Sequence, residues 1–113
     1  MSNPSVKRLA GPVAMSATMT TNIFNASDSL IYSVIKHIHI ANKAGAPTTF
    51  SLWLGATGAN TAGTELFSAH SVAAASEFDY YCNLKMLSTD FLVGGASAGT
   101  SLTIVVEGEQ YVV

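Results

Sequence analysis

Two histidines separated by one residue, His37 and His39, are the side chains whose type and spacing best suit metal chemistry. On an extended strand such positions share a face, which sets the two imidazoles about 7 Å apart, and His70 could approach from elsewhere. A tetrahedral zinc site needs a third or fourth ligand, and the sequence places neither Cys82 nor a carboxylate to supply one. We therefore expect outward-facing polar positions here, without a metal ion or other cofactor.

Acid–base, nucleophilic and phosphate-binding chemistry have still weaker support. Glu77 and Asp79 share one face of a predicted strand and could act as acid and base, but a solvated strand face normally carries charges. The chain has neither a G-x-S-x-G elbow nor a Cys/His signature around Cys82. Segments 55–63 and 94–95 lack the Lys-Ser/Thr of a phosphate-binding loop and are predicted to be turns. The sequence favours a protein that is not an enzyme, and an enzyme using a His37/His39 metal site is the weakest of the hypotheses.

The composition indicates a small domain that a partner covers. Charged residues make up 11% of the 113 residues, against roughly 25% in an average soluble protein, and the net charge is -2. Five basic residues are too few for dedicated nucleic-acid binding, and the apolar runs are too short for a membrane-spanning helix. Because interface cores are depleted in Lys, Glu and Asp, we expect the chain to assemble with itself or with another protein.

Short strands are the elements that must position these residues. Residues 78, 80, 82, 84 and 86 are apolar and alternate with more polar neighbours, which is typical of a strand packed on one side. Further strands are predicted at residues 31–41, 48–54, 91–93 and 101–107. Residues 64–68 and 71–75 are predicted to form either two more short strands or one kinked strand. About seven or eight strands at this spacing predict an all-β fold, an antiparallel β-sandwich or jelly roll.

The connections between these strands follow from their turn residues. The predicted strand 31–41 has Lys36 on the same parity as its apolar residues Tyr32, Val34, Ile38 and Ile40. Either a β-bulge shifts the register at this lysine or the outer end of the strand lies at the sheet margin. Residues 42–47 form a turn that joins this strand to residues 48–54 in a predicted hairpin, and residues 55–63 form an exposed, mobile loop. Residues 94–99 are predicted to form another turn. Gly108 and Glu109 are expected to end the last strand, which leaves a short apolar segment at 110–113 that a neighbour would cover.

An extended N-terminal arm, residues 1–17, precedes the single β-sandwich domain of residues 18–113. The polar, Pro-containing start and the break at Gly11-Pro12 are expected to prevent any regular element in the arm. Such an arm either frays or becomes ordered against a neighbouring subunit. Candidate interface residues are arm residues together with aromatic side chains that should not all belong to the core: Lys7, Arg8, Leu9, Pro12, Trp53 and Tyr111.

The order of these segments resembles a group of small tailed-bacteriophage virion proteins. The matching phrases are IKHIHIANKAG at residues 35–45 and TTFSLWLG at 48–55, while FLVGG at 91–95 and LTIVVEG at 102–108 resemble the closing hairpin of that group. The resemblance covers residues 20–108 and consists of strand and turn patterns. It implies a β-sandwich on the phage particle, commonly a trimeric head decoration or cement protein and sometimes a tail or fibre component, without active-site residues.

Composition, arm and resemblance together predict a non-enzymatic structural virion protein that decorates and cements the bacteriophage capsid. Its partners would be the major capsid protein, whose subunits it bridges, and itself as a homotrimer, with no nucleic acid and no membrane. It would be made in the host cytoplasm and located on the capsid surface of the virion. The alternative is a tail or fibre component, or a carbohydrate- or receptor-binding module in which Trp53 and the tyrosines stack on sugar rings.

Overall fold

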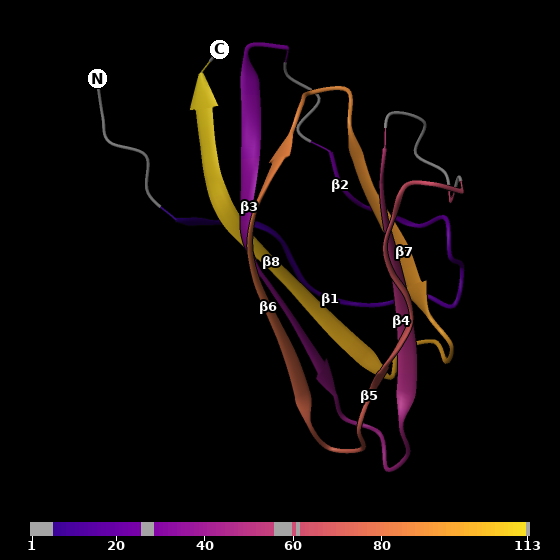
Figure 1. Ribbon diagram of the computed structural model, residues 1–113. Coiled ribbons are helices and arrows are strands. Elements are labelled where there is room, and N and C mark those ends of the chain that lie inside the picture. Colours follow the sequence, from indigo (N-terminus) through magenta and orange to yellow (C-terminus); the bar gives the residue numbers. More distant parts are fainter. Residues whose placement is uncertain (1–5, 26–28, 56–59, 61, 113) are drawn as a thin grey trace.

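The computed structural model describes residues 6–25, 29–55, 60 and 62–112 of the 113-residue chain (Figure 1). Apolar and polar side chains alternate along much of this length, and the described residues accordingly form strands and no helix. The strands are β1 (Lys7–Ala14), β2 (Asn22–Phe24), β3 (Ile31–Asn42), β4 (Thr48–Gly55), β5 (Glu65–Val72), β6 (Glu77–Met86), β7 (Phe91–Ala96) and β8 (Leu102–Val112). Over the same residues, there is no helix long and apolar enough to span a membrane.

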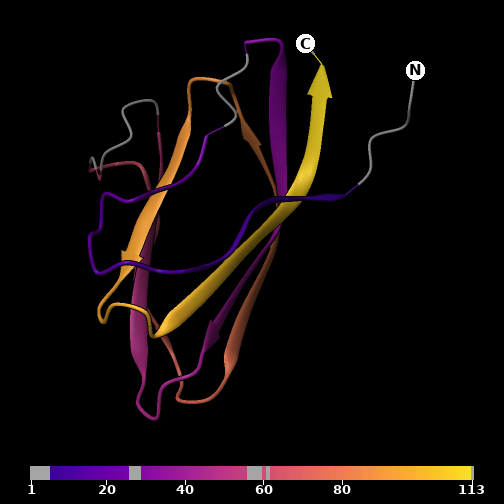
Figure 2. The same ribbon diagram turned by 180° about the vertical axis from the view of Figure 1, so that it is seen from behind.

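Two four-stranded antiparallel sheets form the two layers of the molecule (Figure 1, Figure 2). The first sheet has the order β1-β8-β3-β6, and the second sheet has the order β2-β7-β4-β5. Successive strands mostly alternate between the sheets, so β4 and β5 are the one hydrogen-bonded pair that is also consecutive in the chain. This interleaving is that of a jelly roll, which confirms the predicted all-β antiparallel sandwich.

The core lies between the two sheets and is made of alternate residues from both. In β8, Leu102, Ile104 and Val106 are buried, whereas the residues between them are half-buried. Phe50 and Leu52 of β4 belong to the same buried cluster from the second sheet. Every buried side-chain nitrogen or oxygen in the described residues has a hydrogen-bond partner, as a stable interior requires.

A β-bulge at Lys36 divides β3 into two halves of opposite parity. The register with both neighbouring strands shifts between Ile35 and His37, which confirms the bulge rather than a strand end at the sheet margin. The core face therefore uses odd-numbered residues before the bulge and even-numbered residues after it. Tyr32 and Val34 precede the bulge and lie on the outer face, although they share the parity of the buried residues Ile38 and Ile40.

The two hairpins expected from the sequence do not form. β3 and β4 lie in different sheets, and so do β7 and β8, so each connection crosses from one layer to the other. Turn residues in the sequence show that the chain reverses direction, but they do not show which strands pair. In a jelly roll, strands joined by a turn can enter different sheets and pair with strands from other parts of the chain. Residues 64–68 and 71–75 were expected to form either two short strands or one kinked strand. The structure has the single kinked strand β5, with Ala69 at a φ of 48° where the register is irregular.

Gly94 and Gly95 lie inside β7, where the sequence predicts a turn. A β-carbon on Gly94 would lie 2.2 Å from the carbonyl oxygen of Ser51, and a β-carbon on Gly95 would also lie within 3.0 Å of backbone. The two glycines are therefore required by the close approach of neighbouring chain, not by a turn. The turn itself follows β7, at residues 97–101.

The first sheet includes segments that were expected to be irregular. β1 runs through Gly11-Pro12, whose peptide bond is cis, and it pairs with β8 with register shifts on both sides of Ala10. The prediction that Gly11-Pro12 prevents a regular element is wrong, because an edge strand tolerates a proline at such irregularities. β8 likewise continues through Gly108 and Glu109 instead of ending there. Residues 1–5 of the predicted arm and residues 56–59 and 61 of the predicted loop lie outside the described residues.

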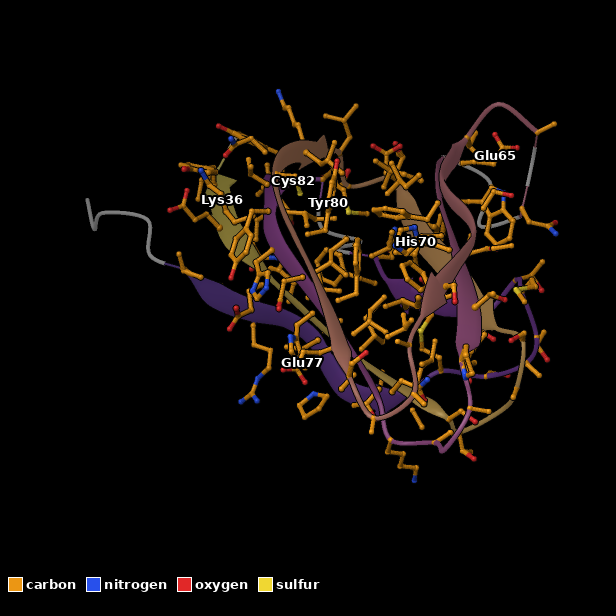
Figure 3. The ribbon with its side chains drawn as sticks, turned by 60° about the horizontal axis from the view of Figure 1, so that its bottom comes forward. Lys36, Glu65, His70, Glu77, Tyr80 and Cys82 are labelled. Carbon is orange, nitrogen blue, oxygen red and sulfur yellow. The ribbon has the colours of Figure 1, made fainter. Side chains whose placement is uncertain are left out.

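The flank between edge strands β5 and β6 is only partly closed. These strands end different sheets, and their inward side chains lie between the two layers (Figure 3). The ring centroids of Phe67 and Tyr80 lie 5.0 Å apart, and those of His70 and Phe78 lie 4.5 Å apart. All four rings are half-buried, which explains why β6, despite its strict alternation, has no buried residue before Met86.

Candidate functional site

Four polar side chains meet on the outer face of the first sheet: His37, His39, Asp79 and Glu107. We call them the outer-face cluster. β3 carries both histidines and lies between β6 and β8, so carboxylates from either neighbour can reach them. The register sets His39 opposite Asp79 and His37 opposite Glu107. The bulge at Lys36 makes this possible, because it places the odd-numbered residues that follow it on the outer face.

Asp79 is the centre of the outer-face cluster. Its Oδ1 atom lies 2.7 Å from Nε2 of His37 and 2.6 Å from Nδ1 of His39. On the other side of the His37 ring, Nδ1 lies 3.0 Å from Oε1 of Glu107. The ring of Tyr81 stacks on His37 with a centroid distance of 4.3 Å and an interplanar angle of 2°. Two carboxylates and one aromatic ring thus fix the orientation of the His37 imidazole.

The carboxylates shift the protonation equilibria of the cluster. Desolvation opposes the protonation of His37, but hydrogen bonds with Glu107 and Asp79 and their negative charges outweigh it and raise the pKa of this imidazole. The pKa of Asp79 is lowered, chiefly by its hydrogen bond with His39 and then by that with His37. In the metal-free protein these shifts favour a protonated His37 beside an ionised Asp79.

The sequence identifies the histidine pair but not the carboxylates that complete the cluster. Asp79 is 40 residues from His39, and Glu107 is 70 residues from His37. The expectation that no carboxylate is placed to act as a third ligand is therefore corrected. Within the described residues, His37, His39 and Asp79 form a group that could hold a metal ion, with ligand atoms within 4.8 Å of one another.

The other candidate residues for chemistry lie apart from the cluster. His70 lies between the sheets against Phe78 (Figure 3). Cys82 is on the inward parity of β6, where its Sγ donates a hydrogen bond to the carbonyl oxygen of Ile35 at 3.3 Å, and burial raises the pKa of the thiol. Glu77 is exposed on the same face of β6 as Asp79, which confirms the solvated polar face predicted for this strand.

A second feature is an apolar end, where β3 begins and β6 and β8 finish (Figure 1). Leu30, Leu87 and Val112 are exposed there to 63%, 52% and 80% of their surface. Next to them, Tyr32 and Tyr111 stack with ring centroids 5.1 Å apart. We use the name apolar end for these five residues. Grouped exposed apolar side chains mark a surface that contacts another molecule.

The structure distributes the predicted interface residues over three places: Lys7, Arg8, Leu9, Pro12, Trp53 and Tyr111. The four arm residues lie on edge strand β1, where three are exposed and the leucine is half-buried against the core. The tryptophan is half-buried on β4, in the other sheet. The tyrosine belongs to the apolar end, where its hydroxyl donates a hydrogen bond to Glu109. Their part in an interface stays a prediction.

Comparison with known proteins gives likenesses of fold. The chain matches no protein-family model, and no curated protein is significantly similar to it in sequence. A protein of the Bacillus endospore appendages, described as disulfide-linked pili, is similar with a TM-score of 0.54 and 16% identity over 99% of this chain and 92% of that chain. The Tobacco streak virus coat protein, in its dimer structure, is similar with a TM-score of 0.50 and 13% identity over 97% and 86% of the two chains. These likenesses show the fold.

Proposed function

We propose that this protein is a non-enzymatic structural virion subunit that decorates and cements a bacteriophage capsid, bridging major capsid protein subunits as a homotrimer. The observation that carries the proposal is the apolar end, where three large aliphatic side chains are more than half exposed on an otherwise complete jelly roll. The charge content of only 11% supports it, since interface surfaces are poor in charge. The shared fold with a viral coat protein and a pilus protein is consistent with a structural role.

Burial of the apolar end would stabilise an assembly through the hydrophobic effect. Covering an exposed Leu or Val side chain fully is worth about 1.5–3 kcal/mol, and stacked tyrosines are typical anchors of interfaces. A protein that binds only the assembled, folded shell stabilises that shell by mass action, without any chemical step. Such a role needs no catalytic group, and a surface made of aliphatic and aromatic side chains fits it.

The start of the chain can take part in the same contact. β1 begins opposite Gly108, in the half of β8 that leads to the apolar end, and Val6 just before it is 61% exposed. We assign the predicted interface residues Lys7 and Arg8 to this contact.

Capsid particles prepared with and without the protein test the cement role. We expect particles that lack it to lose resistance to heat or osmotic shock, and unchanged resistance would contradict the proposal. The variants Leu87→Ser and Val112→Ser should weaken particle binding at least about tenfold each, because loss of 1.4 kcal/mol of burial corresponds to a factor of ten. Ala74→Ser, at an exposed position between β5 and β6 at the opposite end, is the control and should bind normally.

The homotrimer is tested separately from capsid binding. Analytical ultracentrifugation of the free protein, and subunit counting in particle density, should both give three copies. A monomer in solution and on the particle would contradict the trimer and leave the cement role to the particle experiment.

One observation favours the alternative of a tail-fibre or carbohydrate-binding module. The ring of Tyr81 is 74% exposed and is held flat against His37, which makes it a platform on which a sugar ring could stack. Glycan-array binding that Tyr81→Ala or Trp53→Ala abolishes would favour this function over capsid cementing. A blank array would remove its support.

A further inference from the structure

We propose that His37, His39 and Asp79 bind one divalent transition-metal ion of the zinc class on the outer face of the first sheet. The ligands come from β3 and β6, two strands whose pairing fixes their relative positions. This site is separate from the apolar end and independent of the structural role proposed above.

The donor atoms already converge on one point. His37 Nε2 and His39 Nδ1 both lie within 2.7 Å of the same oxygen of Asp79. Zinc bonds of about 2.0–2.2 Å in a tetrahedral site set the donors roughly 3.3–3.5 Å apart. The carboxylate therefore has to withdraw by less than about 1 Å, and the two imidazole nitrogens have to approach each other, because the three ligand atoms span 4.8 Å in the metal-free protein. The Asp79 side chain is 36% exposed, and solvent offers it room for that movement.

The surroundings of His37 favour positive charge at this point. Both ring nitrogens of His37 face carboxylate oxygens, which can only accept. In the metal-free protein a proton on each nitrogen satisfies them. A metal ion bound to Nε2 and Asp79 replaces the proton on Nε2, which is released to solvent, and Nδ1–H continues to donate to Glu107.

Glu107 acts as a positioning residue, not as a ligand. Metal-bound histidines commonly donate their second N–H to a carboxylate, which fixes the tautomer and the orientation of the ring. Glu107 lies 3.0 Å from Nδ1 of His37, and the stacked ring of Tyr81 holds the imidazole from its face. Glu107 and Tyr81 therefore hold the His37 ring so that Nε2 is directed at the ion position beside Asp79 before the ion arrives.

The donor set selects the class of ion. Two imidazole nitrogens and one carboxylate oxygen suit zinc and its first-row neighbours, whereas magnesium and calcium prefer oxygen ligands alone. Asp79 and Glu107 also bring two negative charges, which one divalent cation balances. Because the His39 and Asp79 side chains are about one-third exposed, at 35% and 36%, water can occupy the remaining coordination position.

Zinc titration of the full, untagged chain after EDTA treatment tests the site. Calorimetry and equilibrium dialysis with zinc chloride should give one ion per chain. His37→Gln, His39→Gln and Asp79→Asn should each weaken zinc binding at least about tenfold, and Glu107→Ala, which keeps all three ligands, should weaken it about 10- to 100-fold. Circular dichroism and thermal midpoints establish that each variant is folded.

Two substitutions serve as matched controls. Glu77→Gln removes a carboxylate from the same face of the same strand as Asp79, and His70→Gln removes the histidine that lies between the sheets. Both should bind zinc as the wild type does. Equal zinc affinity in Asp79→Asn and Glu77→Gln would overturn the proposal, and so would the absence of saturable binding at millimolar zinc.

Nitrogen-15 NMR of the imidazoles gives a readout that is specific to the atoms. On zinc addition, Nε2 of His37 and Nδ1 of His39 should take the shifts of coordinated nitrogens, while Nδ1 of His37 stays protonated towards Glu107. Coordination through the opposite nitrogens, or through His70, would contradict the assigned geometry. These measurements use the isolated chain, so their outcome does not depend on whether the protein binds a capsid.

Discussion

His37 makes the stability of the metal-free protein depend on pH. Its pKa in the folded protein lies above 6.5, so its contribution to stability is complete below pH 6.5 and is lost as the pH rises through the folded-state pKa. Asp79 has the opposite sign, because its pKa lies below 3.8: its contribution is present above pH 3.8 and is lost as the pH falls through the folded-state value. The outer-face cluster therefore stabilises the fold most between these two pH values.

Urea denaturation in the presence of EDTA measures this effect. We expect the wild-type unfolding midpoint to fall as the pH rises above 6.5, and the His37→Gln variant to lose part of that fall. Glu77→Gln should retain the wild-type dependence. The same slope in His37→Gln as in the wild type would show that the proton on His37 is not coupled to folding.

Residue spacing predicts only half of this cluster. The separation of His37 from His39 is a local property, and the two-residue period of a strand places both side chains on one face. Asp79 and Glu107 join them because β3 lies between β6 and β8, an arrangement that no short sequence pattern records. The sequence does mark Asp79 as outward-facing, but it does not indicate which strand lies beside it.

Among the elements, β7 depends most directly on a single residue type. A β-carbon on Gly94 would lie 2.2 Å from the Ser51 carbonyl oxygen and 2.7 Å from a side-chain carbon of Leu52. Gly94→Ala should therefore lower the free energy of unfolding by about 1–3 kcal/mol, the usual cost of overpacking, measured by urea denaturation. Gly45→Ala, where nothing lies within 4 Å, should be neutral or slightly stabilising. Equal stability of the two variants would contradict this account of β7.

Strand positions were more predictable than strand partners. The alternation of apolar residues in β6 and β8 is a property of each segment alone, and it locates both strands correctly. Gly94-Gly95 and Gly108 appear as breaks because glycine is common in turns, whereas here it admits neighbouring backbone. The expected hairpins fail for a different reason, since turn residues do not encode which sheet the chain enters next.

At the scale of the whole molecule, the sheets are held together by segments far apart in the chain. Five of the six strand pairings join non-consecutive strands. Folds dominated by such contacts refold in about milliseconds to seconds, because long loops must close before the contacts form. Stopped-flow fluorescence of Trp53, the single tryptophan and half-buried on β4, should show this rate. Refolding in microseconds would contradict it.

The place of β8 also governs when the chain can fold during its synthesis. β8 lies between β1 and β3, and these two strands have no hydrogen bonds to each other (Figure 2). The first sheet therefore cannot close until residues 102–112 have left the ribosome, although β4, β5 and β7 can already pair. Until then, the inward side chains of β1 and β3 lack the strand that joins them, and exposed apolar surface of this kind promotes aggregation.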